Sequence, residues 1–264
     1  MGCSLRSYIF LVFVVSFFSL CSGEDGDVVE VKSGVYSVGA DDEELVKKGW
    51  SQSGDTVRVK RFSIDKFPVT NFRFRAFVRA TKYKTEAEDF GWSFVFSRAL
   101  SAEMNNASEH IQDAPWWKAV QGAYWRQPEG KGSSITQVLQ YPVVHVSKRD
   151  AEAFCKWEGK RLATEHEWEV AARGGYEDGE LPWAKDMEQS AKHSSHLNSW
   201  HGRFPDGEEL VDGFMRTSPV DAFPPQNSLG LHDMLGNVWE WTSSTMKGVC
   251  LFSRILYRCP GGSE

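Results

Sequence analysis

One short stretch of the sequence, GLHDMLGNVWEW (Gly230–Trp241), combines oxygen-bearing side chains with glycines and two tryptophans. Asp233 and Glu240 place a carboxylate at either end, and the backbone at Gly236 and Val238 can leave regular pairing and present its carbonyl oxygens. Calcium binds roughly six to eight oxygens drawn from carboxylates, amides and carbonyls. The stretch therefore raises the possibility of calcium binding, but its spacing departs from the EF-hand pattern and by itself favours ordinary solvated carboxylates.

A second oxygen-rich stretch lies upstream, where Asn198 and Asp212 bracket a loop that contains glycine and proline and continues to Phe214. Glycine lets a chain leave regular pairing, so carbonyl oxygens become available there. This stretch does not follow the EF-hand pattern either. A cation site and a solvated loop therefore both remain open.

Other residues that could do chemistry do not form a complete motif. His166 and Glu167 begin like a zinc-protease helix, but the second histidine of that motif is missing. His193 and His196 could clamp a metal, although a solvated loop is favoured because no further ligand follows at a suitable spacing. The sequence also contains no Gly-x-Ser-x-Gly and no phosphate loop. Nothing here indicates a hydrolase or a kinase.

The composition describes a globular chain that is rich in large rings. It has 264 residues, 41% of them hydrophobic, with 11 tryptophans and a formal net charge of −6. Aromatic side chains bury much area each, so a core can form around little regular secondary structure. A modest negative charge argues against nucleic acid or an anionic membrane as the main partner, since both attract clustered Lys and Arg.

The first 23 residues have the features of a secretory signal peptide. Arg6 precedes an apolar run over Tyr8–Leu20, and the small residues Cys21, Ser22 and Gly23 follow it. A membrane anchor is the alternative, but the run is shorter than the roughly 20 residues that a spanning helix needs. We expect residues 1–23 to be removed, residues 24–264 to form the mature protein, and no later segment to span a membrane.

Entry into the secretory pathway changes how the cysteines are interpreted. Cys155, Cys250 and Cys259 remain after the signal, so at least one thiol has no partner within the chain. Asn106 begins the sequon Asn-Ala-Ser in a polar stretch, which predicts a glycosylation site at the surface.

Alternating apolar residues predict strands over residues 33–40, 55–65 and 141–147. Between the last two, residues 83–137 are irregular, and their many rings must pack into a core formed elsewhere. No repeat, linker or shift in composition marks a second domain. Short strands that alternate with short helices therefore predict one α+β domain.

Three helices have clear start signals. The first is capped by Thr70 or Asn71, and the second follows Ser147 and carries a variant capping box. The third begins at a full capping box, in which Thr164 and Glu167 exchange hydrogen bonds, and it ends at the Gly174–Gly175 pair.

Several long segments together resemble the formylglycine-generating enzyme family, also called the sulfatase-modifying factors. They occur in the family's order and cover most of the chain from about Ser33 to Thr242. They read FSIDKFPVTNFRFRAFV, FGWSFVF, WWKAVQGAYWRQPEG, YPVVHVSKRDAEAFCKWEGKRLATEHEWEVAARGG and DGFMRTSPVDAFPPQNSLGLHDMLGNVWEW. The resemblance implies a single compact α+β domain, related to C-type lectin-like folds, with little regular secondary structure.

The resemblance also implies two calcium sites and so strengthens the interpretation of the two oxygen-rich stretches. Asp233 stands where the family's enzyme has Asn, which adds a charge and keeps an oxygen. The implied ligands of one site are Asn198, Ser199, Asp212 and Phe214, and those of the other are Asp233, Gly236, Val238 and Glu240.

Catalysis is not implied. The family's enzyme oxidises a sulfatase cysteine with O₂ and with copper held by two cysteines of a C-terminal segment, and this chain departs from the family soon after Thr242. The spacing and neighbours of Cys250 and Cys259 do not match that copper pair, so we expect no catalytic residue and no copper. Ala172 also replaces a structural cysteine, and Cys155 corresponds to a disulfide cysteine whose partner lies in the segment that differs.

These departures resemble the family's non-catalytic branch. That branch implies residence in the lumen of the endoplasmic reticulum and binding to sulfatases and to the active enzyme, with restraint of sulfatase activation. No Lys-Asp-Glu-Leu-type signal occurs at Ser263–Glu264, so retention and secretion both remain open. The altered end also leads us to expect a splice variant or an incomplete gene prediction, with part of the family domain missing after about residue 242.

Two other functions remain as alternatives. One is a copper oxidase that uses Cys250 and Cys259 as improvised ligands. The other is a lectin-like recognition module that uses the aromatic loops between Trp92 and Trp125.

Overall fold

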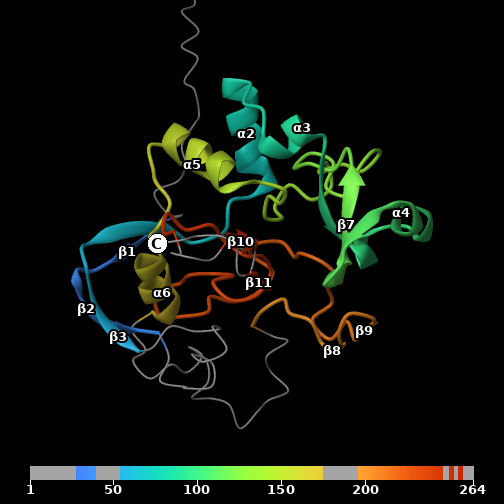
Figure 1. Cartoon of the computed structure of the whole chain (residues 1–264). Coiled ribbons are helices and arrows are strands. Elements are labelled where there is room, and N and C mark those ends of the chain that lie inside the picture. Colours follow the sequence, from blue (N-terminus) through green and yellow to red (C-terminus); the bar gives the residue numbers. More distant parts are fainter. Residues whose placement is uncertain (1–27, 40–53, 175–195, 246–249, 253–254, 258–264) are drawn as a thin grey trace, which may run out of the picture.

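Several small sheets and short helices surround long stretches of irregular chain in the computed structural model (Figure 1). The structure describes residues 28–39, 54–174, 196–245, 250–252 and 255–257. The helices are α2 (Asn71–Thr81), α3 (Glu86–Phe90), the 3-10 turn η1 (Ser97–Ala99), α4 (Ala102–Ala107), α5 (Lys148–Trp157) and α6 (Glu165–Arg173). The predicted signal peptide, residues 1–23, lies outside the described residues.

The described strands form small antiparallel sheets. Four of these are two-stranded and pair β1 with β4, β2 with β3, β8 with β9, and β10 with β11. The fifth has three strands, with β7 between β5 and β6. Their bounds are β1 (Val28–Val31), β2 (Gly34–Val38), β3 (Asp55–Val59), β4 (Phe62–Asp65), β5 (Trp92–Phe96), β6 (Glu109–Ile111), β7 (Ala114–Gln121), β8 (Gly202–Arg203), β9 (Gly207–Glu208), β10 (Cys250–Phe252) and β11 (Ile255–Tyr257). This mixture confirms the α+β class and the expected scarcity of regular structure.

The N-terminal strands form one core with α6. Val31, Val38 and Val59 are buried against Val170 and Ala171 of α6. Figure 1 shows α6 beside the strands β1 to β3. The single strand predicted over residues 55–65 is wrong in one respect, because the chain breaks between β3 and β4 and the two halves pair with different partners.

A second core lies beneath α2 and α5 and consists mainly of rings. Phe74 and Phe77 of α2 meet Phe154 of α5 and the fully buried Trp125, with ring centroids 5.4–5.8 Å apart. Edge-to-face and offset pairs of this kind add to the hydrophobic burial of each ring. We call these residues, with Val78 and Ile135, the aromatic core.

The predicted helix starts are confirmed. The side chain of Thr70 accepts a hydrogen bond from the amide of Arg73 at the start of α2. Ser147 begins α5 and Thr164 begins α6, each with both bonds of a capping box. Capping satisfies amides that the first helical turn leaves without a partner, so these short polar signals fix where each helix begins.

The strand predicted over residues 141–147 is wrong. The backbone of His145 has φ of 58°, which a strand does not allow, and residue 142 is a proline. The ring of His145 holds this conformation, because Nδ1 lies 2.9 Å from Oγ of Ser93 and Nε2 lies 2.8 Å from the carbonyl oxygen of Pro128. Burial lowers the pKa of His145 to about 4.

Residues 83–137, which look irregular in sequence, contain the three-stranded sheet β5-β7-β6 and two short helices. Within this range, the buried residues Val95, Val120 and Ala123 form a third small core. From residue 196 to 245 the chain is almost entirely coil, apart from the two-residue strands β8 and β9. In the part of the chain that the structure describes, no helix has the length and apolarity required to cross a bilayer.

Candidate functional site

In the first predicted calcium set, Asn198, Ser199, Asp212 and Phe214, the carboxylate of Asp212 bonds to Ser199 and Phe214, and Asn198 directly precedes Ser199 in the chain. Oδ2 of Asp212 accepts a hydrogen bond from the amide of Ser199 at 3.0 Å, and Oδ1 accepts one from the amide of Phe214, also at 3.0 Å. Asn198 is buried, and its Nδ2 donates to the carbonyl oxygen of Arg216 at 2.6 Å. We call these four residues the first loop set. Hydrogen bonds thus join segments that lie thirteen residues apart in the sequence.

The second predicted set, Asp233, Gly236, Val238 and Glu240, lies on a tightly turning segment, and we call it the second loop set. Asp233 and Gly236 have φ of 52° and 85°, in the left-handed region. Glycine is required at position 236 for a second reason, since a Cβ atom there would lie 2.5 Å from the carbonyl oxygen of Asn198. The two loop sets therefore contact each other directly.

Asp233 carries a buried carboxylate with no cationic partner among the described Lys and Arg side chains. Only 2% of the residue is exposed, and desolvation raises the pKa of its carboxyl group to about 6. A hydrogen bond from Nδ2 of Asn237, 2.7 Å from Oδ2, opposes this shift, while the negative charge of Asp221 adds to it. A buried carboxylate is costly unless it is paired or coordinates a metal.

Glu240, at the other end of the second loop set, contacts α6. Its Oε2 accepts a hydrogen bond from Nε1 of Trp168 at 2.6 Å. Desolvation raises the pKa of its carboxyl group to about 7, and the negative charges of Asp233 and Asp65 act in the same direction. Part of Glu240 is exposed to water, which weakens that effect, so Asp233 is the more informative of the two carboxylates.

Two side-chain amides that were not among the predicted ligands hold these loops together. Asn237 bonds to Asn198, Ser218 and Asp233. Gln226, which is buried, donates from Nε2 to the carbonyl oxygens of His196 and Leu235 and accepts the amide of Leu235. Asn and Gln offer both donors and acceptors, so each can join two segments of coil. One signal in the sequence could have identified Asn237, namely its position directly after Gly236.

The donors present suit calcium better than a transition metal. In the described residues, no three His, Cys, Asp or Glu side chains gather as a metal site. Calcium does not need such a group, because backbone carbonyls and an Asn amide can supply half of its oxygens. The observation that favours a cation here is the buried carboxylate of Asp233, which forms no ion pair with a Lys or Arg side chain that the structure describes.

The cysteines do not form a described thiol pair. Cys155 is a free thiol on α5, half-buried, and desolvation raises its pKa. Cys250 pairs through the backbone with Tyr257 across the β10–β11 hairpin, while Cys259 lies outside the described residues. Copper chemistry of the kind expected in this family needs two convergent thiolates. Cys155 is the one cysteine of the mature chain whose side chain the structure describes, so no copper step is derived for this chain.

Two other predicted positions are simpler to place. Asn106 is exposed on α4, where a glycan could be attached without steric hindrance from a core. His193 lies outside the described residues, so the suggestion of a clamp with His196 stays a prediction.

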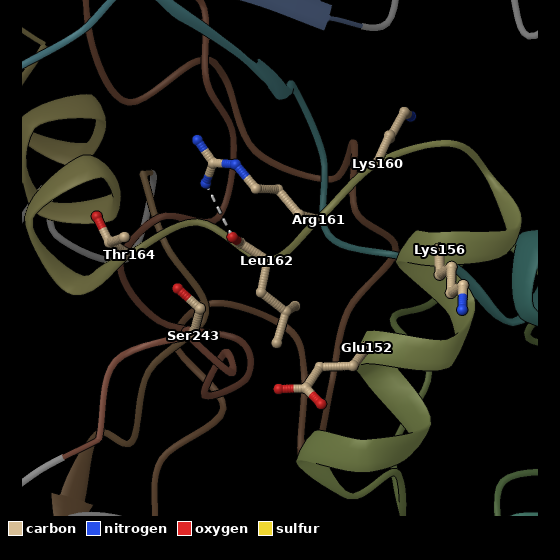
Figure 2. Close-up of a pocket in the computed structure, with 7 residues that line it drawn as sticks. All are labelled: Glu152, Lys156, Lys160, Arg161, Leu162, Thr164 and Ser243. Atoms are coloured by element: carbon tan, nitrogen blue, oxygen red, sulfur yellow. Dashed lines mark hydrogen bonds between the residues drawn. The ribbon is translucent and has the colours of Figure 1, made fainter.

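A shallow cavity of about 410 Å³ lies between α5, α6 and the chain at Ser243. Figure 2 shows Leu162, Glu152 and Ser243 facing this space, while the ammonium groups of Lys156 and Lys160 extend away from it. The strongest charged groups at its rim are already paired, since Arg161 forms two hydrogen bonds to Glu167 and Lys160 binds Asp65 and Glu158. This cavity has no reacting group set up for chemistry.

A cluster of half-buried and exposed aromatic rings adjoins both loop sets. Neighbouring ring centroids lie 4.9–6.3 Å apart. Phe204 is 46% exposed and Trp239 is 58% exposed. Trp200 directly follows Ser199, and Trp239 lies between Val238 and Glu240, so the loop sets position part of this surface. Its members are Phe96, Trp116, Trp117, Trp200, Phe204 and Trp239, and we call them the aromatic surface.

The chain is similar to proteins of one known family over most of its length. Residues 18–263 match the model of the sulfatase-modifying factor enzyme 1-like domain. A Bos taurus protein named inactive C-alpha-formylglycine-generating enzyme 2 is 45% identical over 261 residues, which is 97% of this chain and 84% of that protein. The Mus musculus protein of the same name is 51% identical over 200 residues, 76% of this chain and 63% of its own length, so this chain spans less than two thirds of it.

The chain is also similar in sequence to a protein named as the enzyme, and in fold to a solved structure. The formylglycine-generating enzyme of Thermomonospora curvata is 44% identical over 214 residues, covering 81% of this chain and 70% of that enzyme. Among solved structures, PvdO from Pseudomonas aeruginosa superimposes with a TM-score of 0.57 at 23% identity, over 83% of this chain and 70% of that one. This second likeness concerns the fold alone.

Proposed function

Because the chain belongs to the sulfatase-modifying factor family, we propose that it is a non-catalytic, calcium-binding protein of the secretory pathway that contacts sulfatases or the active formylglycine-generating enzyme and restrains sulfatase activation. The single observation that carries this proposal is the 45% identity, across 97% of the chain, to a relative whose name calls it inactive. Residence in the endoplasmic reticulum lumen is part of the same proposal.

Calcium would be held by the two loop sets, which were expected as ligands from the sequence. When bound, it supplies positive charge beside Asp233 and Asp212 and links segments of coil that otherwise depend on hydrogen bonds. Residues of the chain itself position the proposed ligands. Asn237 and Gln226 hold the loops by hydrogen bonds, and Trp168 orients the carboxylate of Glu240. The role proposed for the ion is therefore structural, and it extends to the rings that the loops carry.

The aromatic surface is the part of the molecule that we propose as the contact with the partner protein. Exposed apolar patches on soluble proteins commonly mark interaction sites, and large rings dominate the energy of many interfaces. The apolar patch continues along the same loop, where Leu210, Val211 and Met215 are 50%, 57% and 43% exposed.

A binding experiment tests the proposed contact. Purified chain with Phe204→Ala or Trp239→Ala is compared with wild type for binding to an immobilised sulfatase and to the active enzyme. We expect each substitution to weaken binding roughly tenfold or more, as is usual for a central interface ring. Phe90→Ala is the matched control, because Phe90 is 68% exposed at the end of α3 and does not belong to the aromatic surface. Equal losses in all three variants would contradict the assignment.

A further inference from the structure

We infer that Asn237 couples the two loop sets, so that a calcium ion bound at one set raises the affinity of the other. This inference rests on the proposed calcium binding and goes beyond it. It assigns a positioning role to a residue that is not itself a proposed ligand. The structure offers three separate observations for it: the contacts of Asn237, the close approach of the two loop sets at Gly236, and the buried carboxylate of Asp233.

The contacts of Asn237 reach both loop sets at once. Its backbone amide donates to the carbonyl oxygen of Asn198 at 2.9 Å, and Nδ2 of Asn198 lies 3.4 Å from its Oδ1. Its Nδ2 donates to Oδ2 of Asp233 at 2.7 Å. Asn198 is a proposed ligand of the first set and Asp233 one of the second. One side chain therefore touches a member of each.

The same side chain is fixed from a third direction. Oδ1 of Asn237 accepts the amide of Ser218 at 2.9 Å, and Nδ2 donates to the carbonyl oxygen of Ser218 at 3.2 Å. The amide of Asn237 thus has little freedom to follow one loop set without the other. Its φ of 52° is one that Asn tolerates better than most residues.

Gly236 allows the two loop sets to approach each other closely. The position where a Cβ atom would stand lies 2.5 Å from the carbonyl oxygen of Asn198 and 3.0 Å from Cδ1 of Leu197. The carbonyl oxygen of Asn198 thus occupies the space that a side chain at position 236 would need, so Asn198 and Gly236, proposed ligands of different sets, lie next to each other. This close approach places the amide of Asn237 within hydrogen-bond distance of Asn198.

The expected coupling is positive. An ion beside Asp233 compensates a buried charge and orders the segment that carries Asn237. Asn237 then holds Asn198 in place, so the second ion meets a loop whose ordering has already been achieved. Thermodynamic linkage makes the effect reciprocal, and couplings between sites are commonly about 5- to 150-fold in affinity.

The test is a calorimetric titration of the whole purified chain with CaCl₂ after removal of divalent ions with a chelator, supported by equilibrium dialysis to count bound calcium. Wild type is compared with Asn237→Gly, which keeps the backbone amide, tolerates the positive φ and removes the side chain. The matched control is Ser218→Ala, because Asn237 uses only the backbone of Ser218. Circular dichroism verifies that each variant is folded.

A double-mutant cycle isolates the coupling. Asp212→Asn, which weakens the first set, is expected to lower the affinity of the remaining site at least fivefold in wild type and to leave it unchanged in the Asn237→Gly background. Ser218→Ala is expected to retain the wild-type coupling. Two independent sites in wild type, or the same coupling in Asn237→Gly, would overturn the inference while calcium binding stands. No bound calcium in dialysis would overturn the proposed calcium binding itself, and the inference with it.

Discussion

Two regions of this molecule are built by different interactions. The aromatic core beneath α2 and α5 is held by packed rings, with Phe74 in contact with Phe77, Trp125 and Phe154. The loop region, residues 196–241, is held by side-chain amides and carboxylates that bond to the backbone, chiefly those of Gln226, Asn237 and Asp212. The first region resembles an ordinary hydrophobic core, while the second is coil fixed by polar contacts.

The contrast between packed rings and polar contacts indicates which region stabilises the fold and which carries the proposed function. Apolar burial is roughly proportional to area and tolerates small shifts of the backbone, whereas a polar contact is lost when a donor moves by about an ångström. The aromatic core can therefore support the domain without any ligand. The loop region carries the proposed ion ligands and Trp239 of the aromatic surface, so a bound ion has the greatest effect there.

The largest expected effect comes from emptying the aromatic core. Phe74→Ala removes a ring that is 1% exposed and should lower the free energy of unfolding by about 3–5 kcal/mol. Urea unfolding followed by circular dichroism measures this loss. Phe72→Ala on the same helix is the control, since Phe72 is 52% exposed, and it should cost less than about 1 kcal/mol. Similar losses of stability in the two variants would contradict the claim that the aromatic core stabilises the domain.

Gly236→Ala tests the loop region by sterics alone. The new Cβ would clash with the carbonyl of Asn198 in a left-handed backbone, so we expect a loss of about 2–4 kcal/mol in stability and weaker calcium binding. Gly230→Ala is a closely matched control, because its φ is 81° and no atom lies near its Cβ position. It should show only the backbone cost of about 1–2 kcal/mol. An equal effect at both glycines would show that the Asn198 contact has no special role.

Acid should weaken the hydrogen bonds of His145 to Ser93 and Pro128 at a pH at which the packing of the aromatic core is unaffected. Burial lowers the pKa of His145 to about 4, while in the unfolded chain it titrates near 6.5. Between these values the unfolded chain binds a proton that the folded chain does not, so stability falls as pH drops from 6.5 to 4, by at most about 1.4 kcal/mol per pH unit.

Comparison of wild type with His145→Asn by urea unfolding at pH 7, 5.5 and 4.5 measures this contribution, with His110→Asn as the exposed control. The stability gap between wild type and His145→Asn should narrow as the pH falls. A gap that stays constant over this range would show that His145 titrates normally in the folded protein.

The smallest effect is expected at a helix cap. Thr164→Ala removes the side chain that accepts the amide of Glu167 at the start of α6, and it should cost about 1 kcal/mol. Ser101→Ala, at the cap of the short and exposed α4, should cost less because that helix packs against less of the core. Thermal unfolding of both variants gives the order, and the reverse order would place α4, not α6, in the stable part of the domain.

The sequence predicted the parts of the fold whose signals are local. Thr70, Ser147 and Thr164 start helices because a capping side chain acts within one turn. The strand predicted over residues 141–147 is wrong because His145 bonds to Ser93 and Pro128, which lie far away in the sequence. The sheet β5-β7-β6 was missed for a similar reason, since its strands are recognisable only once they pair.

The candidate site was only partly predictable. Both sets of proposed ligands were named from oxygen-rich spacing and from family resemblance, and the structure brings Ser199 and Phe214 of the first set to the carboxylate of Asp212. Asn237 and Gln226 were not identified, because an amide that bridges two coils has no periodic signal. The backbone amide of Asn237 donates to the carbonyl oxygen of Asn198, which lies in a distant part of the sequence, and no local pattern predicts this contact.

The most direct test of the central claim is an activity measurement on the purified chain. A peptide that contains the sulfatase cysteine motif is incubated with the protein, O₂, a reductant and Cu(I), and the aldehyde product is detected by mass spectrometry, with an active formylglycine-generating enzyme as the positive control. We expect no formylglycine above the level without protein, together with measurable binding of the chain to the sulfatase or to the active enzyme. Repeated turnover of the peptide that is lost in Cys250→Ser would contradict it.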